Sequence, residues 1–181
     1  MNTTESLQRL EELTDQYLHT LEQYSEEQLR LQPDEDAWSL GQMIVHLTNT
    51  ALRMQLGSAE KCRVLSEEAS AAATTEVKTA AGEEVFQLGG FPPERIRVPA
   101  SPQYTPAQME SKQQLAEGLQ EVLRRARELE PVIATLPPEI MVAHPRLGGM
   151  NAKEWFLLVE MHYRHHLLQK ERLQSFIAGC V

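Results

Sequence analysis

Apolar residues recur every three or four positions along the first part of the chain, and polar residues fill the positions between them. This spacing places the apolar side chains on one face and predicts an amphipathic helix. Its apolar stripe consists of Leu7, Leu10, Leu13, Tyr17, Leu21 and Tyr24. Ser25 and Gln28 follow with the spacing of a capping box, which predicts a short helical turn that continues to Leu31.

A second apolar stripe predicts a second helix that begins sharply at Ser39. Gln42 lies three residues after Ser39, so the two residues can form another capping box. The stripe consists of Leu40, Ile44, Leu47, Ala51 and Met54. The pattern weakens after Gly57, and we expect the helix to continue to about Glu68.

A third helix is predicted to open at Thr105, which can cap it. Pro106 suits the first helical position, and Gln108 completes the capping box. The apolar positions are Leu115, Leu119, Val122, Ala126, Leu129 and Ile133. We expect this helix to stop before Pro137.

The fourth helix is predicted to open at Asn151, a favourable cap with Glu154 three residues later. Its apolar pattern continues without a break to about Ala178, and Gly179 is a typical stop. Four amphipathic helices without a convincing strand predict an all-α protein, with one four-helix-bundle domain spanning residues 1–181.

The segment 69–104 separates the second helix from the third and sustains neither a strand period nor a helix period. Loops of this length are uncommon in compact domains and tend to be functional or mobile, although part of 70–81 can form a surface helix. A long connection of this kind can cross the bundle, whereas the short connection before it suits antiparallel neighbours. The predicted topology is therefore up-down-down-up.

Charge and composition exclude several classes of protein. The net charge is −9, and the densest basic segment, 124–127, is flanked by glutamates, so we expect a solvated helix face and no nucleic-acid partner.

No apolar run approaches the roughly 20 residues of a membrane span. The N-terminal residues are polar and acidic, without the apolar core of a signal peptide, so we expect a cytoplasmic protein. Cys62 and Cys180 form no disulfide framework, and we expect both to be reduced.

Histidines on two of the predicted helices are candidates for a metal site. His162 and His166 are four residues apart and therefore project from one helix face, about 5–6 Å apart at Cβ. His46 lies on the shoulder of the apolar stripe of the second helix and can supply a third ligand. Three imidazoles leave a coordination position open, as in catalytic zinc sites, and imidazole also suits nickel, iron and copper.

Other interpretations of the histidines stay open at this point. A single histidine on a helix shoulder is more often a hydrogen-bonded core residue, and pairs at this spacing also occur on ordinary helix surfaces. His165 points about 100° away from His166 and is expected at the surface. His19 is expected to be a partly buried residue beside the first stripe, and not a ligand. His144 is expected to have a loop role before the last helix, with an approach to the mouth of the site as the alternative.

Two segments of the chain resemble the signatures of the DinB/YfiT-like superfamily, a family of metal-dependent four-helix bundles. They are WSLGQMIVHL at 38–47 and the segment from Glu154-Trp155-Phe156 to HYRHHLLQ at 162–169. The stretch from Gly90 to Pro99 is similar to the crossover of these proteins, and the resemblance covers essentially the whole chain.

The resemblance implies a metal site and a class of function. It implies that His46, His162 and His166 bind a divalent metal ion, zinc or nickel above all, and that the protein forms a homodimer. It also supports the up-down-down-up topology. Characterised relatives include transferases that use low-molecular-weight thiols and a thiol-dependent maleylpyruvate isomerase, and others are assigned as metal-dependent hydrolases. We therefore expect a small-molecule substrate and transfer of a low-molecular-weight thiol, or metal-assisted hydrolysis. The alternatives are a non-catalytic bundle that binds a metal or small ligand, and a dimerisation module with packed histidines.

Few other residues are expected to take part in the chemistry, and the catalytic group itself is left unassigned. Hydrolysis would usually need a carboxylate base, but Glu160 points about 200° away from His162 and is interpreted as a surface charge. The lack of a base favours thiol transfer. Hydrogen-bond partners for the histidines are harder to assign, and Gln42, Asn49 and Gln169 are candidates only by their proximity. Trp38 and Trp155 are interpreted as packing aromatics at the helix starts.

Overall fold

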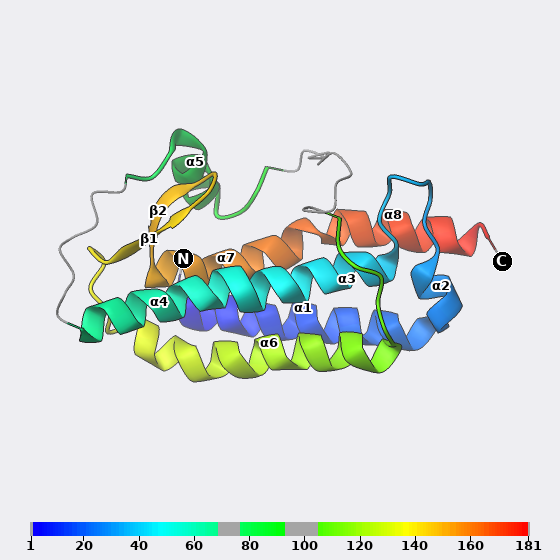
Figure 1. The fold of residues 1–181 in the computed structure, drawn as a ribbon, viewed down its shortest axis with the longest axis horizontal. Helices are drawn as coiled ribbons and strands as arrows, with labels where there is room; N and C mark the ends of the chain where they lie inside the picture. The colour runs from blue at the N-terminus through cyan, green and yellow to red at the C-terminus, as the bar shows by residue number, and fades with distance from the viewer. Residues whose placement is uncertain (1, 69–76, 93–104, 181) are drawn as a thin grey trace.

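The computed structural model describes residues 2–68, 77–92 and 105–180. Four long helical segments lie side by side in it (Figure 1). They are α1 (Thr3–Gln23), α3 (Leu40–Asn49) with its continuation, α6 (Lys112–Ile133), and α7 (Ala152–His165) followed by α8 (Leu167–Ala178). Helices α1 and α7–α8 run in one direction, and α3–α4 and α6 run in the other (Figure 1). The predicted all-α bundle and its up-down-down-up order are confirmed.

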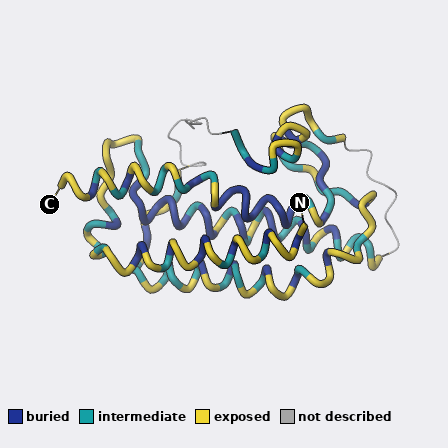
Figure 2. The backbone as a smooth tube through the Cα atoms, turned by 180° about the vertical axis from the view of Figure 1, so that it is seen from behind, coloured by how far each residue is buried: buried dark blue, intermediate teal, exposed yellow. Residues whose placement is uncertain are grey.

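The four segments enclose one apolar interior. Helix α1 packs against α6 and α7, and the segment α3–α4 closes the ring because it contacts the same two helices. Figure 2 shows buried residues along the faces that the helices turn toward each other. Tyr17, Met43, Leu119 and Trp155 are among the fully buried side chains, one from each helical segment. The apolar stripes predicted from the sequence therefore form the core.

Local capping signals define the starts of three helices as predicted. Ser25, Ser39 and Asn151 each form a complete capping box with the residue three positions later. The first of these opens the short helix α2 (Glu26–Arg30). These caps position the helices that carry the candidate ligands because each one sets the first residue of its helix.

The predicted start of the third helix at Thr105 is wrong, because α6 begins at Lys112 with Ser111 as its cap. The preceding residues make tertiary contacts instead of a helical turn. The carbonyl of Pro106 accepts a hydrogen bond from Gln42 Nε2 at 2.9 Å, and Met109 is buried in the core. These contacts with the start of α3 outweigh the local capping signal at Thr105.

The second and fourth helices are both interrupted close to the histidines. After α3, the π-helical segment η1 (Thr50–Gln55) leads into α4 (Leu56–Glu67). The predicted unbroken fourth helix is wrong, since α7 and α8 are separated at His166. Beside this break the Tyr17 hydroxyl donates a hydrogen bond to the Tyr163 carbonyl at 2.8 Å. A side-chain donor inserted among helical carbonyls is a recognised cause of such breaks.

A short β-hairpin, which the sequence did not predict, precedes α7. Its strands β1 (Met141–His144) and β2 (Gly148–Asn151) pair antiparallel, and Trp155 donates its indole N–H to the Val142 carbonyl at 3.1 Å. Gly148 has φ +77°, in the region that favours glycine.

The crossover carries a helix as well. Helix α5 (Ala80–Leu88) is capped by Thr79, whose backbone N–H donates to Leu147 O in the hairpin turn at 2.9 Å. Most of the surface helix considered for 70–81 lies outside the described residues, and the expectation that 69–104 lacks regular structure is wrong for 80–88. No helix within the described ranges is long and apolar enough to cross a bilayer.

The Ser39 cap offers a test of how far local signals stabilise the fold. Ser39 is fully buried, accepts a hydrogen bond from Gln42 N at 3.1 Å and donates one to Gln108 Oε1 at 3.3 Å. Replacing Ser39 by alanine is expected to lower the free energy of unfolding by about 1–2 kcal/mol, because a helix cap is lost. Urea unfolding measures this change. Ser175→Ala, which removes an exposed hydroxyl bonded to the Glu171 carbonyl, is the control and should change stability by less than about 0.5 kcal/mol.

Candidate metal centre

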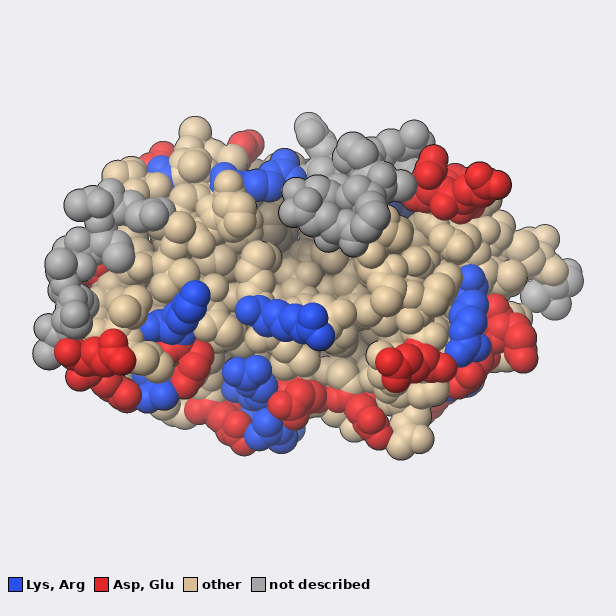
Figure 3. Space-filling view, viewed as in Figure 1, with Lys and Arg blue, Asp and Glu red and all other residues tan. Residues whose placement is uncertain are grey.

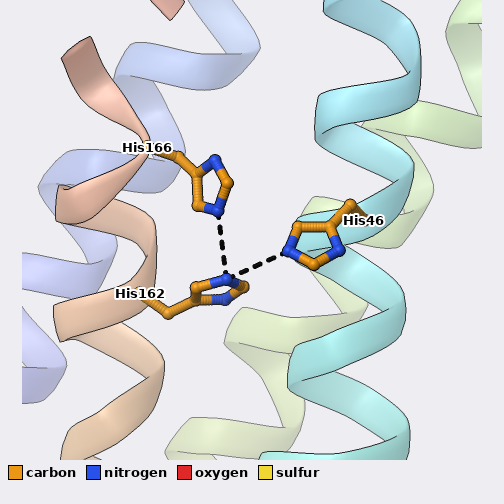
Figure 4. A group of neighbouring side chains, drawn as sticks. All are labelled: His46, His162 and His166. Carbon is orange, nitrogen blue, oxygen red and sulfur yellow. Dashed lines mark hydrogen bonds between the residues drawn. The ribbon is translucent and has the colours of Figure 1, made fainter. Parts of the chain in front are cut away.

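The ring nitrogens of three histidines converge between α3 and α7. His162 Nε2 lies 3.1 Å from His46 Nε2 and 3.1 Å from His166 Nε2. Figure 4 shows the rings of His162 and His166 facing His46 across the gap between the two helices. Among the described residues these three form a group whose ligand atoms all lie within 4.8 Å of one another, so they could hold a metal ion. The structure thus brings together the three residues selected from the sequence.

The surroundings keep the three rings neutral. His162 and His166 are buried, and His46 is mostly buried. Burial lowers the pKa of His46 to about 4, and burial with the nearby His46 lowers the pKa of His166 to about 3. The pKa of His162 is likewise held well below its ordinary value by burial and by its histidine neighbours. Neutral imidazole is the form that binds a metal, so no proton has to be removed near pH 7.

Hydrogen bonds to the outer nitrogens indicate which nitrogen of each ring faces the cluster. His166 Nδ1 lies 2.8 Å from Gln169 Oε1, an acceptor, so Nδ1 carries the proton and Nε2 carries the lone pair. His46 Nδ1 faces the Thr50 hydroxyl at 3.5 Å. Lone pairs directed at one point repel each other unless a proton or a cation lies between them. The donor set therefore fits a divalent transition metal.

These outer contacts differ in part from the candidates chosen by proximity. Gln169 does contact a ring, whereas Gln42 belongs to the cap of α3 and Asn49 is exposed. Thr50 was missed, although it lies four residues after His46, a spacing that brings side chains together on a helix.

Aromatic residues form the walls of the cluster. The Trp38 ring lies 4.9 Å from the His46 ring between centroids, so Trp38 packs on the site, whereas Trp155 is buried in the core as expected. Phe91 lies 6.2 Å from the His162 ring and 5.4 Å from the His165 ring. His165, expected at the surface, is half-buried, and its ring borders the cluster between Phe91 and His166.

The interpretation of Glu160 as a surface charge is also wrong. Its side chain is only 1% exposed and forms an ion pair with Arg164, at 2.7 Å between Oε1 and Nε. Arg164 also donates to the Gly89 carbonyl at 2.6 Å and lies against Gly90, where a Cβ would come within 2.9 Å of the guanidinium. Helix periodicity gave the direction of Glu160 correctly, but it could not show that the residues after α5 cover that side of α7.

The remaining histidines are placed away from the cluster. The partial burial expected for His19 is wrong, because its side chain is exposed on the outer face of α1, 3.4 Å from Glu22. His144 is in β1 instead of a loop, and its Nδ1 accepts hydrogen bonds from the backbone N–H groups of Arg146 and Leu147. Neither histidine contributes a ligand atom to the group of three.

Two arginines of the basic segment 124–127 are exposed and form ion pairs, which agrees with the expected solvated helix face. Arg124 bonds to Glu121 and Glu128, and Arg127 bonds to Glu11 across to α1. On the face shown in Figure 3, basic side chains lie among acidic ones. Cys62 is a buried free thiol whose pKa burial raises to about 11, and Cys180 is free and exposed.

The fold and the cluster define a class of protein, a four-helix bundle with three inward-facing histidines on two of its helices. Residues 9–169 match the DinB superfamily, which is most of the chain. The chain belongs to this superfamily. A comparison with curated proteins found no match.

The lowered histidine pKa values predict how stability depends on pH. An unfolded histidine takes up a proton near pH 6.5, whereas His46 and His166 in the folded protein do so only at about pH 4 and 3. Between these values the unfolded chain binds more protons, so the free energy of unfolding falls as the pH falls. Each of the two rings should contribute up to about 1.4 kcal/mol per pH unit.

Urea unfolding of metal-free protein between pH 7.5 and 5 measures this effect. The variant with His46→Gln and His166→Gln should show a flatter dependence than the wild type. An unchanged slope in the double variant would contradict the assignment.

The ion pair between Glu160 and Arg164 is expected to hold the residues after α5 against α7. Arg164→Met leaves the buried Glu160 carboxylate without its partner and should lower the free energy of unfolding by about 1–3 kcal/mol. It should also speed hydrogen exchange of the Gly90 amide, which donates to Val85 O. Adding Glu160→Gln should restore part of the stability. Arg127→Met, which breaks an exposed pair, is the control and should cost less than about 1 kcal/mol.

Proposed function

We propose that this protein is a metal-dependent enzyme in which His46, His162 and His166 bind one divalent cation, zinc or nickel. The observation that carries the proposal is the convergence of three Nε2 atoms, with His162 Nε2 3.1 Å from each of the other two. Rings packed only for their apolar surface would not need to direct three nitrogens at one point. Membership of the DinB superfamily supports the same assignment.

The number of ligands favours a catalytic centre over a structural one. Structural zinc sites are closed by four protein ligands, whereas catalytic sites keep one position for water or substrate. No Asp, Glu or Cys of the described segments joins the three histidines. A bound divalent cation with an open position would lower the pKa of a thiol or of water and so supply a nucleophile near neutral pH.

The residues of the chain prepare the site for this chemistry. Burial keeps the imidazoles neutral and ready to bind, and Gln169 and Thr50 orient the rings of His166 and His46. The rings of Trp38 and Phe91 offer apolar surface against which a small substrate can pack while water is displaced.

Thiol transfer is the reaction that we favour over hydrolysis. Hydrolysis usually needs a carboxylate beside the cation as a base, and the nearest candidate along α7, Glu160, is buried in its pair with Arg164. A thiol needs only to lose its proton to become a strong nucleophile. The proposed substrates are therefore a low-molecular-weight thiol and a small electrophile, with the protein acting as a homodimer.

Metal binding is tested first, with protein purified without a histidine tag. The wild type should bind about one zinc or nickel ion per chain, whereas His162→Ala should abolish metal binding, because one of only three ligands is removed, and keep its helical circular dichroism. His19→Ala, which removes an exposed histidine, should bind like the wild type. A wild type that holds less than about 0.1 metal ion per chain and does not rebind zinc or nickel would contradict the metal centre.

Activity is tested separately with the metal-loaded protein. It should accelerate conjugation of monochlorobimane with at least one of several cellular thiols, and His162→Ala should not. If it accelerates neither conjugation nor ester or amide hydrolysis, the non-catalytic binding bundle is the better description.

A further inference from the structure

One nitrogen of the histidine cluster has no hydrogen-bond partner among the described residues. His162 Nδ1 is fully buried and unpaired, although the same nitrogen of His166 contacts Gln169 and that of His46 faces Thr50. Because His162 Nε2 faces the cluster, Nδ1 is the nitrogen that carries the proton when a cation is bound. A buried N–H requires an acceptor.

Gln55 offers an unused acceptor on the opposite helical segment. It is the last residue of η1, and its side chain is only 1% exposed. Its Nε2 donates to the Leu158 carbonyl at 3.4 Å, and its Oε1 is buried with no partner in the described part of the chain. The contact with Leu158 sets the orientation of the amide, since the reverse orientation would place two oxygens together.

The geometry of the two helices brings this acceptor toward His162. Leu158 lies one helical turn before His162. The Gln55 amide, which donates to the Leu158 carbonyl, therefore lies one turn of α7 from His162. Side chains on a helix lean toward its N-terminus. Since η1 and α7 run in opposite directions (Figure 1), Gln55 leans toward the level of His46 while His162 leans toward Leu158. We expect this tendency to bring the two side chains toward each other.

We propose that Gln55 is a positioning residue whose Oε1 accepts the hydrogen bond of His162 Nδ1–H through one enclosed water molecule. This contact holds the ring in the tautomer whose Nε2 faces the other two histidines. The inference rests on the proposed metal centre, because a ring that binds a metal through Nε2 must carry its proton on Nδ1. It also gives the π-helical turn a role, because η1 ends at Gln55 and so helps to set the direction of its side chain.

The other unpaired buried groups do not fit this role. Tyr163 OH and Thr14 Oγ1 are also buried and have no partner within the described ranges. However, Tyr163 points about 100° away from His162 around α7, and its ring packs on Tyr17 of α1 at 5.8 Å between centroids. Thr14 lies on α1 as well. This makes Thr14→Val a matched control, since it removes an unpaired buried polar group elsewhere in the core.

The experiment combines zinc affinity with the tautomer of His162. Gln55→Leu removes the acceptor. Competition with a chromophoric chelator should show zinc affinity 10–100-fold weaker for Gln55→Leu and unchanged for Thr14→Val. The tautomer of His162 is read from ¹H–¹⁵N spectra of protein with ¹⁵N-labelled histidine at pH 8. Only Gln55→Leu should show His162 shifted from the Nδ1–H toward the Nε2–H tautomer.

The outcomes separate this inference from the proposed function. If the wild type binds no zinc, the metal centre is wrong, and the tautomer of His162 in metal-free protein still tests the contact with Gln55. If Gln55→Leu keeps both the zinc affinity within threefold and the His162 spectrum, the inference is overturned. If Gln55→Leu does not fold, Gln55→Asn takes its place, because its shorter side chain keeps the amide but withdraws the acceptor from the ring.

Discussion

The approach of three neutral imidazole nitrogens inside the bundle is the constraint on which the rest of this structure depends. Nitrogens separated by 3.1 Å tolerate little error in the positions of α3 and α7. The capping boxes at Ser39 and Asn151 define where these helices begin, and burial of their apolar stripes packs them against each other. Helix capping and core packing therefore support one arrangement, in which three polar rings meet inside the bundle. Burying any one of these polar rings without a partner would destabilise the fold.

The surroundings of the cluster come from segments that are distant in the chain. Trp38 precedes α3, Phe91 follows α5, and Gln169 lies in α8 beyond the helix break. The pair of Glu160 with Arg164 links the outer side of α7 to the residues before Phe91. The wall of the site and its ligands are thus connected through α7, so a change on the outer side of this helix can reach the cluster.

Several features could be predicted because they depend on neighbours in the sequence. A capping box needs two residues three positions apart, and Ser39 with Gln42 met this condition. The same rule failed at Thr105, where the contact of Pro106 with Gln42 took precedence over a helical turn. The hairpin before α7 escaped prediction because its strands are short and depend on Trp155 and on α5 for their packing.

The sequence by itself determined that His162 and His166 share one helix face and that His46 lies beside a buried stripe, because helix periodicity relates residues one turn apart. It also determined, through the apolar pattern, that four long helical segments form the bundle. Only the tertiary structure decided that the three Nε2 atoms meet, that Glu160 is buried and that His165 borders the cluster. These depend on distances between separate helices, which the packing of the whole bundle sets and no local pattern encodes.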